Sequence, residues 1–298
     1  MNSLKIEFQG FIQLLQDEIC KSLEELDGQA VFCEDLWERG DGGGGRSRVI
    51  SKGAVFEKGG VNISSVYGKL PISMREYLKT DYDDFFACGL SLVLHPVNPY
   101  VPTVHANYRY FELYNKEGCI VDQWFGGGSD LTPYYYFKDD KCHFHDIQKS
   151  VCDKSDITLY PRFKEACDRY FYNSHRNEAR GVGGLFYDYL RPEGNRDARF
   201  WFDLVTSLAR VFLPSYIPIV EQRKSMSYSY KEKFWQEIRR GRYAEFNLIH
   251  DKGTLFGLKT NGRIESILMS LPPRVRWEYD FEPESGSPEE ALLLELRR

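Results

Sequence analysis

The sequence predicts an α+β fold, in which α-helices flank a large and mainly antiparallel β-sheet. Two kinds of pattern support this prediction. Several segments carry apolar residues at helical spacing, and others alternate or are rich in β-branched and aromatic residues, with short turns between them. No internal repeat and no proline-rich linker divides the chain, so we expect one domain over residues 1–298.

The composition excludes several classes of protein. Hydrophobic residues make up 42% of the chain and charged residues 28%, which is typical of a soluble globular protein. The net charge of -5 argues against a general affinity for nucleic acid or anionic membranes. Seven scattered cysteines without a CxxC pair indicate reduced thiols. Because neither a targeting sequence nor an apolar run of about 20 residues is evident, we expect a cytoplasmic protein without an integral membrane segment.

The first part of the chain is expected to form one helix and then a series of strands. Apolar residues from Leu4 to Leu26 recur every three or four positions, as in an amphipathic helix. The glycine-rich segment from Asp41 to Arg46 is expected to be a flexible loop. Five strands are then expected: two within residues 48–68, on either side of residues 57–60, and one each at residues 85–95, 103–113 and 119–125.

Helices are expected to dominate the next part. They are expected at residues 139–152, 161–180, 196–213 and 229–240, with Gly181, Pro214 and Gly241 as stop signals of the last three. The chain then returns to strands, with a hairpin turn of sequence Thr-Asn-Gly-Arg. These last elements are strands at residues 243–249 and 254–259, the turn at 260–263, one or two strands ending near Tyr279, and a short acidic C-terminal helix.

One strand face is unusually polar. Strand residues alternate between faces, so His105, Asn107 and Arg109 share a side with Phe111, while Val104, Ala106, Tyr108 and Tyr110 share the other. The preceding strand places Ser91 and His95 together on one face in the same way. If the two polar faces coincide, histidine, asparagine, serine and arginine converge without a carboxylate, which favours an anion-binding site. The alternative is a face that simply meets water.

A glycine-rich block follows the next predicted strand. Gly126, Gly127 and Gly128 leave the backbone accessible, and Asp130 comes directly after Ser129. One interpretation is a sharp turn in which Asp130 bonds its own backbone. The other is a carboxylate that accepts N–H bonds from a ligand.

Four of the six histidines raise the possibility of a metal site. His95, His105, His145 and His175 are the candidates, but no HExxH motif and no clustered Cys/His set accompanies them. Hydrogen-bonded histidines are the alternative. No nucleotide motif is present, because the Arg180-Gly-Val-Gly-Gly segment lacks dinucleotide spacing, and its pattern suggests a charge at a helix C-terminus.

Four stretches of the chain together resemble one enzyme family, the oxygen-dependent coproporphyrinogen III oxidases. They are GLSLVLHPVNPYVPTVHANYRYFEL, WFGGGSDLTPYYYF, YPRFKEACDRYFYNSHRNEARGVGGLFYD and EFNLIHDKGTLFGLKTNGRIESILMSLPPRVRWEYDFEP. They span most of residues 85–282. The resemblance implies oxidative decarboxylation of the ring A and B propionates of coproporphyrinogen III, in haem biosynthesis, to give protoporphyrinogen IX, CO2 and H2O2. It also implies a homodimer, O2 as cosubstrate and no organic cofactor.

The family motifs assign roles to individual residues. His105 would exchange a proton, Asp130 would accept pyrrole N–H bonds, and Arg109 would clamp a propionate. Arg180 would be a further carboxylate partner. The substrate-binding residues would be Ser91, Asn107, Tyr108 and Arg109, joined by Asn261, Gly262 and Arg263 from the hairpin turn. Some members are described with a divalent metal on histidines matching His95, His105, His145 and His175, and we expect that metal not to be essential.

Two rival functions remain open at this stage. One is a metal-dependent oxygenase of an unrelated substrate that uses the same histidines. The other is a non-catalytic binder of tetrapyrroles or polycarboxylates. Formation of peroxide in air separates an enzyme from a binder, and chelation separates a metal enzyme from one without metal.

Overall fold

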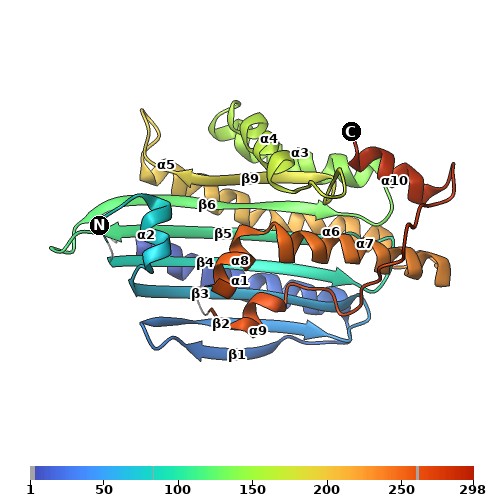
Figure 1. The fold of residues 1–298 in the computed structure, drawn as a ribbon, viewed down its shortest axis with the longest axis horizontal. Helices are drawn as coiled ribbons and strands as arrows, with labels where there is room; N and C mark the ends of the chain where they lie inside the picture. The colour runs from blue at the N-terminus through green and yellow to red at the C-terminus, as the bar shows by residue number, and fades with distance from the viewer. Residues whose placement is uncertain (1–3, 83, 260–261) are drawn as a thin grey trace.

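The fold is organised by one antiparallel sheet, which confirms the predicted α+β class. The computed structural model describes residues 4–82, 84–259 and 262–298. Within them seven strands pair in the order β1-β2-β3-β4-β5-β6-β9 (Figure 1). The strands are β1 (Cys33–Glu38), β2 (Gly43–Ser51), β3 (Phe56–Lys69), β4 (Asp84–Pro96), β5 (Thr103–Tyr114), β6 (Ile120–Thr132) and β9 (Gly183–Leu190). A separate short pair consists of β7 (Tyr172–Asn173) and β8 (Glu178–Ala179).

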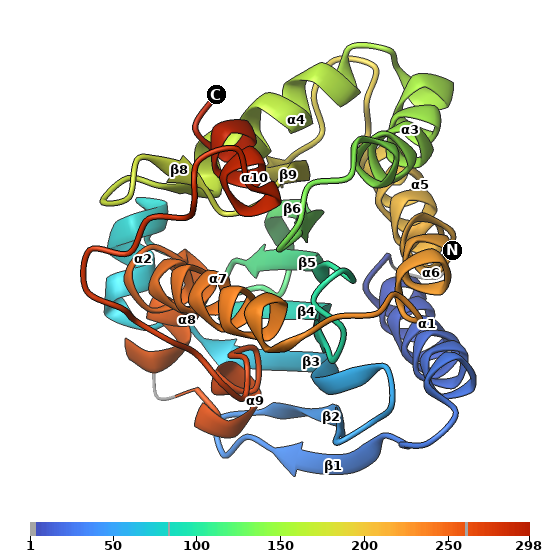
Figure 2. The ribbon, with the colours of Figure 1, turned by 90° about the vertical axis from the view of Figure 1, so that its right-hand side faces the viewer.

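Helices cover both faces of the sheet. In Figure 2, α1, α3, α5 and α6 lie along one face, and α7, α8 and α9 lie across the other. The helices are α1 (Leu4–Asp27), α2 (Ile72–Leu78), α3 (Lys138–Ser155), α4 (Leu159–Tyr170), α5 (Ala198–Arg210), α6 (Phe212–Arg223), α7 (Tyr230–Ile249), α8 (Lys252–Lys259), α9 (Ile264–Leu268) and α10 (Pro288–Leu296).

Strand alternation decides what each face carries. The apolar even positions of β4 and β5 point into the core under α1 and α5, where Leu90, Tyr108 and Tyr110 are almost completely buried. The apolar stripe of α1 packs on the same side, with Phe8 edge-on to the ring of Phe125. The odd positions of both strands therefore face α7, α8 and α9. This division confirms that Tyr108 and Tyr110 lie opposite to His105 and Arg109.

One helical stretch of the described chain is long and apolar enough to span a membrane by length and composition. It runs from Ala198 to Arg223, through α5 and α6, and 61% of its most apolar window is buried inside the fold. Trp201 and Tyr216, for example, are fully buried in the main core. The apolarity of this stretch is therefore explained by packing against the sheet and its neighbouring helices.

Several predicted boundaries in the first half were wrong. Residues 43–46 are not a loop, because they begin β2 and pair with β1, an edge strand that the sequence pattern did not reveal. The turn between β2 and β3 lies at residues 52–55 rather than 57–60. β6 continues straight through Gly126, Gly127 and Gly128, so the glycine block is a strand and not a sharp turn.

The predicted helix over residues 161–180 ends ten residues early. α4 stops at Tyr170, and the chain turns through the β7–β8 hairpin, where Asn177 has a φ of 52°. Gly181 is therefore not a helix stop. Pro214 is not one either: the break falls at Val211, and Pro214 lies in the first turn of α6, where its missing N–H is tolerated.

The predicted C-terminal strands were also wrong. Residues 243–249 belong to α7, which a Ser229–Glu232 capping box starts and which continues through Gly241. A Cβ at Gly241 would lie 2.7 Å from the carbonyl oxygen of Arg276, so this glycine serves a close approach of the chain. Helices α8 and α9 replace the expected hairpin strands, and residues 260–261 of its turn lie outside the described residues. No strand occurs within residues 262–298, whereas the short acidic helix is confirmed as α10.

Candidate active site

The polar residues predicted from β4 and β5 lie on one face of the sheet, as expected. Antiparallel partners directly opposite each other point to the same side. Ser91 pairs with Asn107, and Asn107 pairs with Gly128. His105 pairs with Asp130, so Asp130 joins the same face from β6. The sheet thus carries two neighbouring cross-strand pairs of polar side chains, Ser91 with Asn107 and His105 with Asp130, on the side that faces α7 and α8.

His105 and Asp130 form the most defined contact on this face. Nδ1 of His105 lies 2.9 Å from Oδ1 of Asp130, and Asp130 is buried while the His105 side chain is 21% exposed. Because a carboxylate only accepts, Nδ1 carries the proton, and a neutral ring then has its lone pair on Nε2. No hydrogen bond to Nε2 is found within the described chain. His105 is therefore oriented to exchange a proton at Nε2 with a bound ligand.

Arg180 lies behind Asp130 and makes a two-point contact with it. Its Nη2 is 2.7 Å from Oδ1, and its Nε is 3.2 Å from Oδ2. Burial alone would raise the pKa of Asp130, but the charge of Arg180 and the hydrogen bond from His105 outweigh it and hold that pKa below its ordinary value. Asp130 is therefore ionised at neutral pH although it is buried.

Arg180 is buried and is not presented as an accessible carboxylate partner. Its side chain is only 2% exposed, and its remaining donor Nη1 is 3.1 Å from Oδ1 of Asn247 on α7. Its guanidinium lies over the rings of Phe171, at 4.0 Å, and Phe246, at 4.8 Å. An arginine enclosed in this way is shielded from a ligand carboxylate. It neutralises and orients Asp130 instead.

The same contacts also make Asp130 inaccessible to a ligand. Both of its oxygens are engaged by His105 and Arg180, and its side chain is 1% exposed. The expected direct bond to a pyrrole N–H is not available in this arrangement. Asp130 accepts the Nδ1–H of His105 and so fixes the orientation of that ring.

Arg109 is the accessible cation of the face. Its side chain is 40% exposed, and its Nη2 lies 3.0 Å from Oδ2 of Asp188 on β9. Gly89 and Gly126 flank it on β4 and β6, so the floor around it is flat. The side chain is thus presented to a ligand in the way expected of a carboxylate clamp, with Asp188 as a neighbour that the sequence pattern did not identify.

Two asparagines on the same face of the sheet have unused acceptors. Oδ1 of Asn107 and Oδ1 of Asn62, which pairs with Ser91 from β3, are buried and have no hydrogen-bond partner within the described chain. An unpaired buried acceptor costs about 1–3 kcal/mol. N–H donors of a bound ligand would satisfy both. Asn62 was missed because its partner strand is set by long-range register.

The segment before α9 closes one side of this floor. Arg263 donates to Asp35 on β1 and, at 3.0 Å, to Ser266 on α9. Ser266 in turn contacts Ser47 on β2 at 2.9 Å. Gly262 precedes this segment, and Asn261, the third predicted residue here, lies outside the described residues. Arg263 is therefore tied to the β1–β2 edge rather than directed at Arg109.

The four candidate metal histidines do not converge. Among the described residues no three His, Cys, Asp or Glu side chains are placed to hold a metal ion. His95 is fully buried, which together with the charge of Arg240 lowers its pKa to about 3, and its Nε2 donates to the carbonyl of Ser270 at 2.8 Å. His145 lies on α3, on the other face of the sheet, with its two nitrogens 2.9 and 3.0 Å from Tyr160 and Val182. The residues present do not fit a shared metal with His105.

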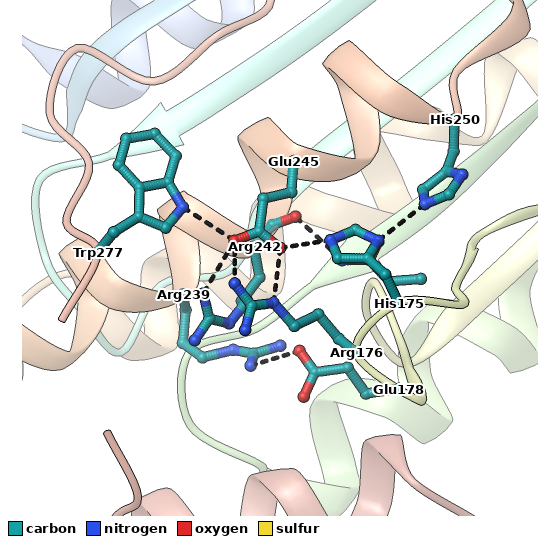
Figure 3. A network of polar contacts seen from close by, with 9 residues as sticks. His175, Arg176, Glu178, Arg239, Arg242, Glu245, His250 and Trp277 are labelled. Carbon is teal, nitrogen blue, oxygen red and sulfur yellow. Dashed lines mark hydrogen bonds and ion pairs between the residues drawn. The ribbon is translucent and has the colours of Figure 1, made fainter. Parts of the chain in front are cut away.

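His175 belongs to a separate network centred on Glu245 of α7 (Figure 3). Glu245 accepts from His175 Nε2 at 2.8 Å, from Arg176 at 2.7 and 2.8 Å, and from the indole of Trp277 at 2.9 Å. Nδ1 of His175 lies 3.0 Å from His250 Nε2. The network ties the β7–β8 hairpin and the segment after α9 to α7, and so holds the helix that carries Asn247.

Two cavities lie away from the polar face. One of about 350 Å³ lies between α1 and the β1–β3 region, and one of about 230 Å³ lies between α7, the β7–β8 hairpin and residues 278–283. Neither is lined by His105, Arg109 or Asp130. The chemistry of the side chains, and not the cavity volume, identifies the candidate site.

Comparison with known proteins places almost the whole chain in one family. The family profile described as coproporphyrinogen III oxidase matches residues 7–298. An oxygen-dependent coproporphyrinogen-III oxidase of Glycine max, named as chloroplastic, is 51% identical over 98% of this chain and 77% of its own length. Coproporphyrinogen-III oxidase 1 of Arabidopsis thaliana, also named as chloroplastic, is 50% identical over 98% of this chain and 78% of its own length. The oxygen-dependent enzyme of Prochlorococcus marinus strain NATL1A is 50% identical over 99% and 90%, and its name carries no organelle.

Proposed function

Because the chain belongs to the coproporphyrinogen III oxidase family, we propose that it catalyses the oxygen-dependent decarboxylation of coproporphyrinogen III to protoporphyrinogen IX in haem biosynthesis. Each of two propionates becomes a vinyl group. For one side chain, R–CH2–CH2–COO⁻ plus O2 and one proton gives R–CH=CH2, CO2 and H2O2. The observation that carries the proposal is the shared face of His105, Asn107 and Arg109, next to the ion pair of Asp130 and Arg180.

The exposed residues of the site are proposed to contact the substrate, and the buried ones to position them. Arg109 binds a substrate propionate, because it is the exposed cation and its planar guanidinium matches a carboxylate at two points. Ser91 and Asn107 line the floor beside it, and position 108 contributes only its backbone. The free Nε2 of His105 exchanges the proton of the reacting side chain. Asp130 and Arg180 are positioning residues that hold the His105 tautomer and keep the negative charge in place.

Electrons for the reduction of O2 come from the substrate. A tetrapyrrole that is not yet aromatic is electron-rich, so the proposed reaction needs no flavin or nicotinamide. The proposal includes no step through a metal, since His95, His145 and His175 lie on separate elements with their nitrogens engaged.

We expect extensive dialysis against a strong chelator to leave most of the activity. The physical reason is the poor donor geometry of His95, His145 and His175 relative to His105. The measurement is turnover before and after dialysis, with metal content determined on the same samples. Stoichiometric metal in active protein, with activity that follows its removal and return, would contradict this expectation.

The direct test of the proposed function is incubation of the purified protein with coproporphyrinogen III, in air and without oxygen. We expect protoporphyrinogen IX, detected as a fluorescent porphyrin after oxidation, with two CO2 and two H2O2 per product in air and none without oxygen. A protein that binds coproporphyrinogen III but releases no CO2 in air would be a binder and not this enzyme. Metal-dependent turnover of a different substrate, with no reaction of coproporphyrinogen III, would indicate the unrelated oxygenase.

A homodimer is the proposed assembly. The strands expected to pair are absent from the described residues, but this part of the chain carries exposed apolar side chains: Leu258, Ile264, Trp277 and Tyr279 are 40%, 56%, 54% and 100% exposed. Exposed apolar groups in one region favour association. Light scattering at micromolar concentration should give twice the 34.8 kDa of one chain. A single-chain mass would contradict the dimer.

For location we propose the cytoplasm. The cyanobacterial relative, whose name carries no organelle, supports this, and the chloroplastic names of the plant relatives give the alternative. A fluorescent fusion of the full-length gene product in its own cell would separate the two locations.

A further inference from the structure

The space above Gly126 holds the ion pair of Arg109 with Asp188, a residue to which the proposed reaction assigns no role. A Cβ at Gly126 would lie 2.6 Å from Nε of Arg109 and 2.7 Å from Oδ1 of Asp188. A Cβ there would push these two side chains aside, so glycine at position 126 leaves room for the two groups to meet over β6. The first glycine of the glycine block is thereby explained by the Arg109–Asp188 contact.

A local irregularity in β9 points Asp188 at Arg109. Gly127 pairs with Tyr187, and Phe125 pairs with Leu190, so Asp188 and Tyr189 both lie opposite the single Gly126. This is a β-bulge, which redirects a side chain. Tyr189 has a φ of 53°, and its N–H donates to Oδ1 of Asp188 at 3.0 Å. A non-glycine residue in this region costs about 1 kcal/mol or more, and such strain gathers at functional sites.

We propose that Asp188 competes with the substrate carboxylate for Arg109. This inference rests on the proposed function. In the free protein the carboxylate of Asp188 is paired with the guanidinium of Arg109. A substrate propionate displaces this carboxylate from Arg109. When the ligand leaves, Asp188 returns to Arg109. The binding of carboxylates at this position is thereby kept reversible.

The exposure of the pair supports exchange rather than permanent pairing. Arg109 and Asp188 are 40% and 30% exposed, whereas Arg180 and Asp130 are 2% and 1% exposed. Exposed ion pairs contribute little to stability and break easily, while buried pairs are costly to break. One face of the sheet therefore carries one fixed pair and one exchangeable pair.

Asp188→Asn tests the proposal through the direction in which it changes the affinity for a carboxylate ligand. Coproporphyrin III, the oxidised and unreactive tetracarboxylate, is titrated against wild type and variant by fluorescence. We expect Asp188→Asn to lower its Kd about two- to fivefold, the scale of an exposed ion pair. The KM for coproporphyrinogen III should fall as well, without a rise in kcat. A merely structural role would weaken binding, and an unchanged or raised Kd would overturn the proposal.

Asp122→Asn is the matched control. Asp122 lies on the same face of β6 and pairs with Arg191 at 2.8 Å, with exposures of 32% and 40%. Its removal should leave the Kd unchanged. In a background of Arg109→Gln, Asp188→Asn should have no effect, because the competition acts through Arg109. Tightening that persists there would also overturn the proposal, and Asp188→Ser provides a second variant should Asn not fold.

The outcomes separate this inference from the proposed function. Turnover of coproporphyrinogen III by wild type, with an unchanged Kd in Asp188→Asn, would reject only the competition. Absence of both turnover and porphyrin binding in wild type would reject the function, and the inference with it.

Discussion

Replacing Asp130 with Asn is expected to reduce kcat by about 100-fold or more, with KM within a few-fold of wild type. The amide keeps the shape but loses the charge. The NH2 group of the amide would point at the N–H donors of Arg180 or at Nδ1–H of His105. Nδ1 of His105 would thereby lose its carboxylate acceptor. Proton transfer by a correctly oriented group contributes about 10²–10⁴-fold to rate. Steady-state kinetics with coproporphyrinogen III measures the loss.

Stability must be measured beside the kinetics of Asp130→Asn. Removing one partner of a buried pair costs about 3–5 kcal/mol, so the variant should also unfold earlier. Asp140→Asn is the matched control: Asp140 binds Arg223 at 2.9 and 3.0 Å, in a contact between α3 and α6 on the other face. It should lose stability with little change in kcat. A kcat of Asp130→Asn within about twofold of wild type would reject the role of Asp130.

Replacing Arg109 with Lys is expected to lower kcat/KM at least about 10-fold, or about 1.4 kcal/mol. An ammonium group cannot make the planar two-point contact of a guanidinium with a carboxylate. The loss should appear with the native substrate in steady-state assays, at a stability close to that of wild type, because Arg109 is exposed.

Tyr110→Phe tests whether the correct strand face was assigned. Tyr110 follows Arg109 but points into the core, where its hydroxyl contacts Glu112 at 2.8 Å and Gln123 at 2.7 Å. The variant should lose stability and keep most of its kcat/KM. A severe kinetic loss in Tyr110→Phe, with a near-neutral Arg109→Lys, would mean that the ligand binds on the other side of the sheet.

The sequence predicts the faces of the central strands but not their neighbours. Alternation in β4 and β5 separates His105 and Arg109 from Tyr108, because period two is a local property. Which strand lies beside another depends on long-range register. The contacts of Asn62 with the Ser91 row and of Asp188 with Arg109 could therefore not be inferred. Asp188 also depends on a bulge in β9, a strand for which the local pattern gave no signal.

The remaining errors show tertiary structure overriding local preference. Residues 243–249 are rich in strand-forming types, yet α7 continues through them because its buried side packs on the sheet and Gly241 admits the chain at Arg276. The early end of α4 moves Arg180 off a helix and into the aromatic enclosure beside Asp130. Arg180, which was expected to contact the ligand, is thereby placed behind Asp130, where we propose that it supports His105.

The central claim is that one tetrapyrrole lies across the face formed by His105, Asn107 and Arg109. A crystal structure of the protein with bound coproporphyrin III tests it most directly. The account predicts the macrocycle over β4, β5 and β6, with a propionate within hydrogen-bond distance of Arg109 and His105 Nε2 facing a second side chain of the ligand. A porphyrin bound instead in the cavity beside α1, or in the one between α7 and residues 278–283, would contradict the account.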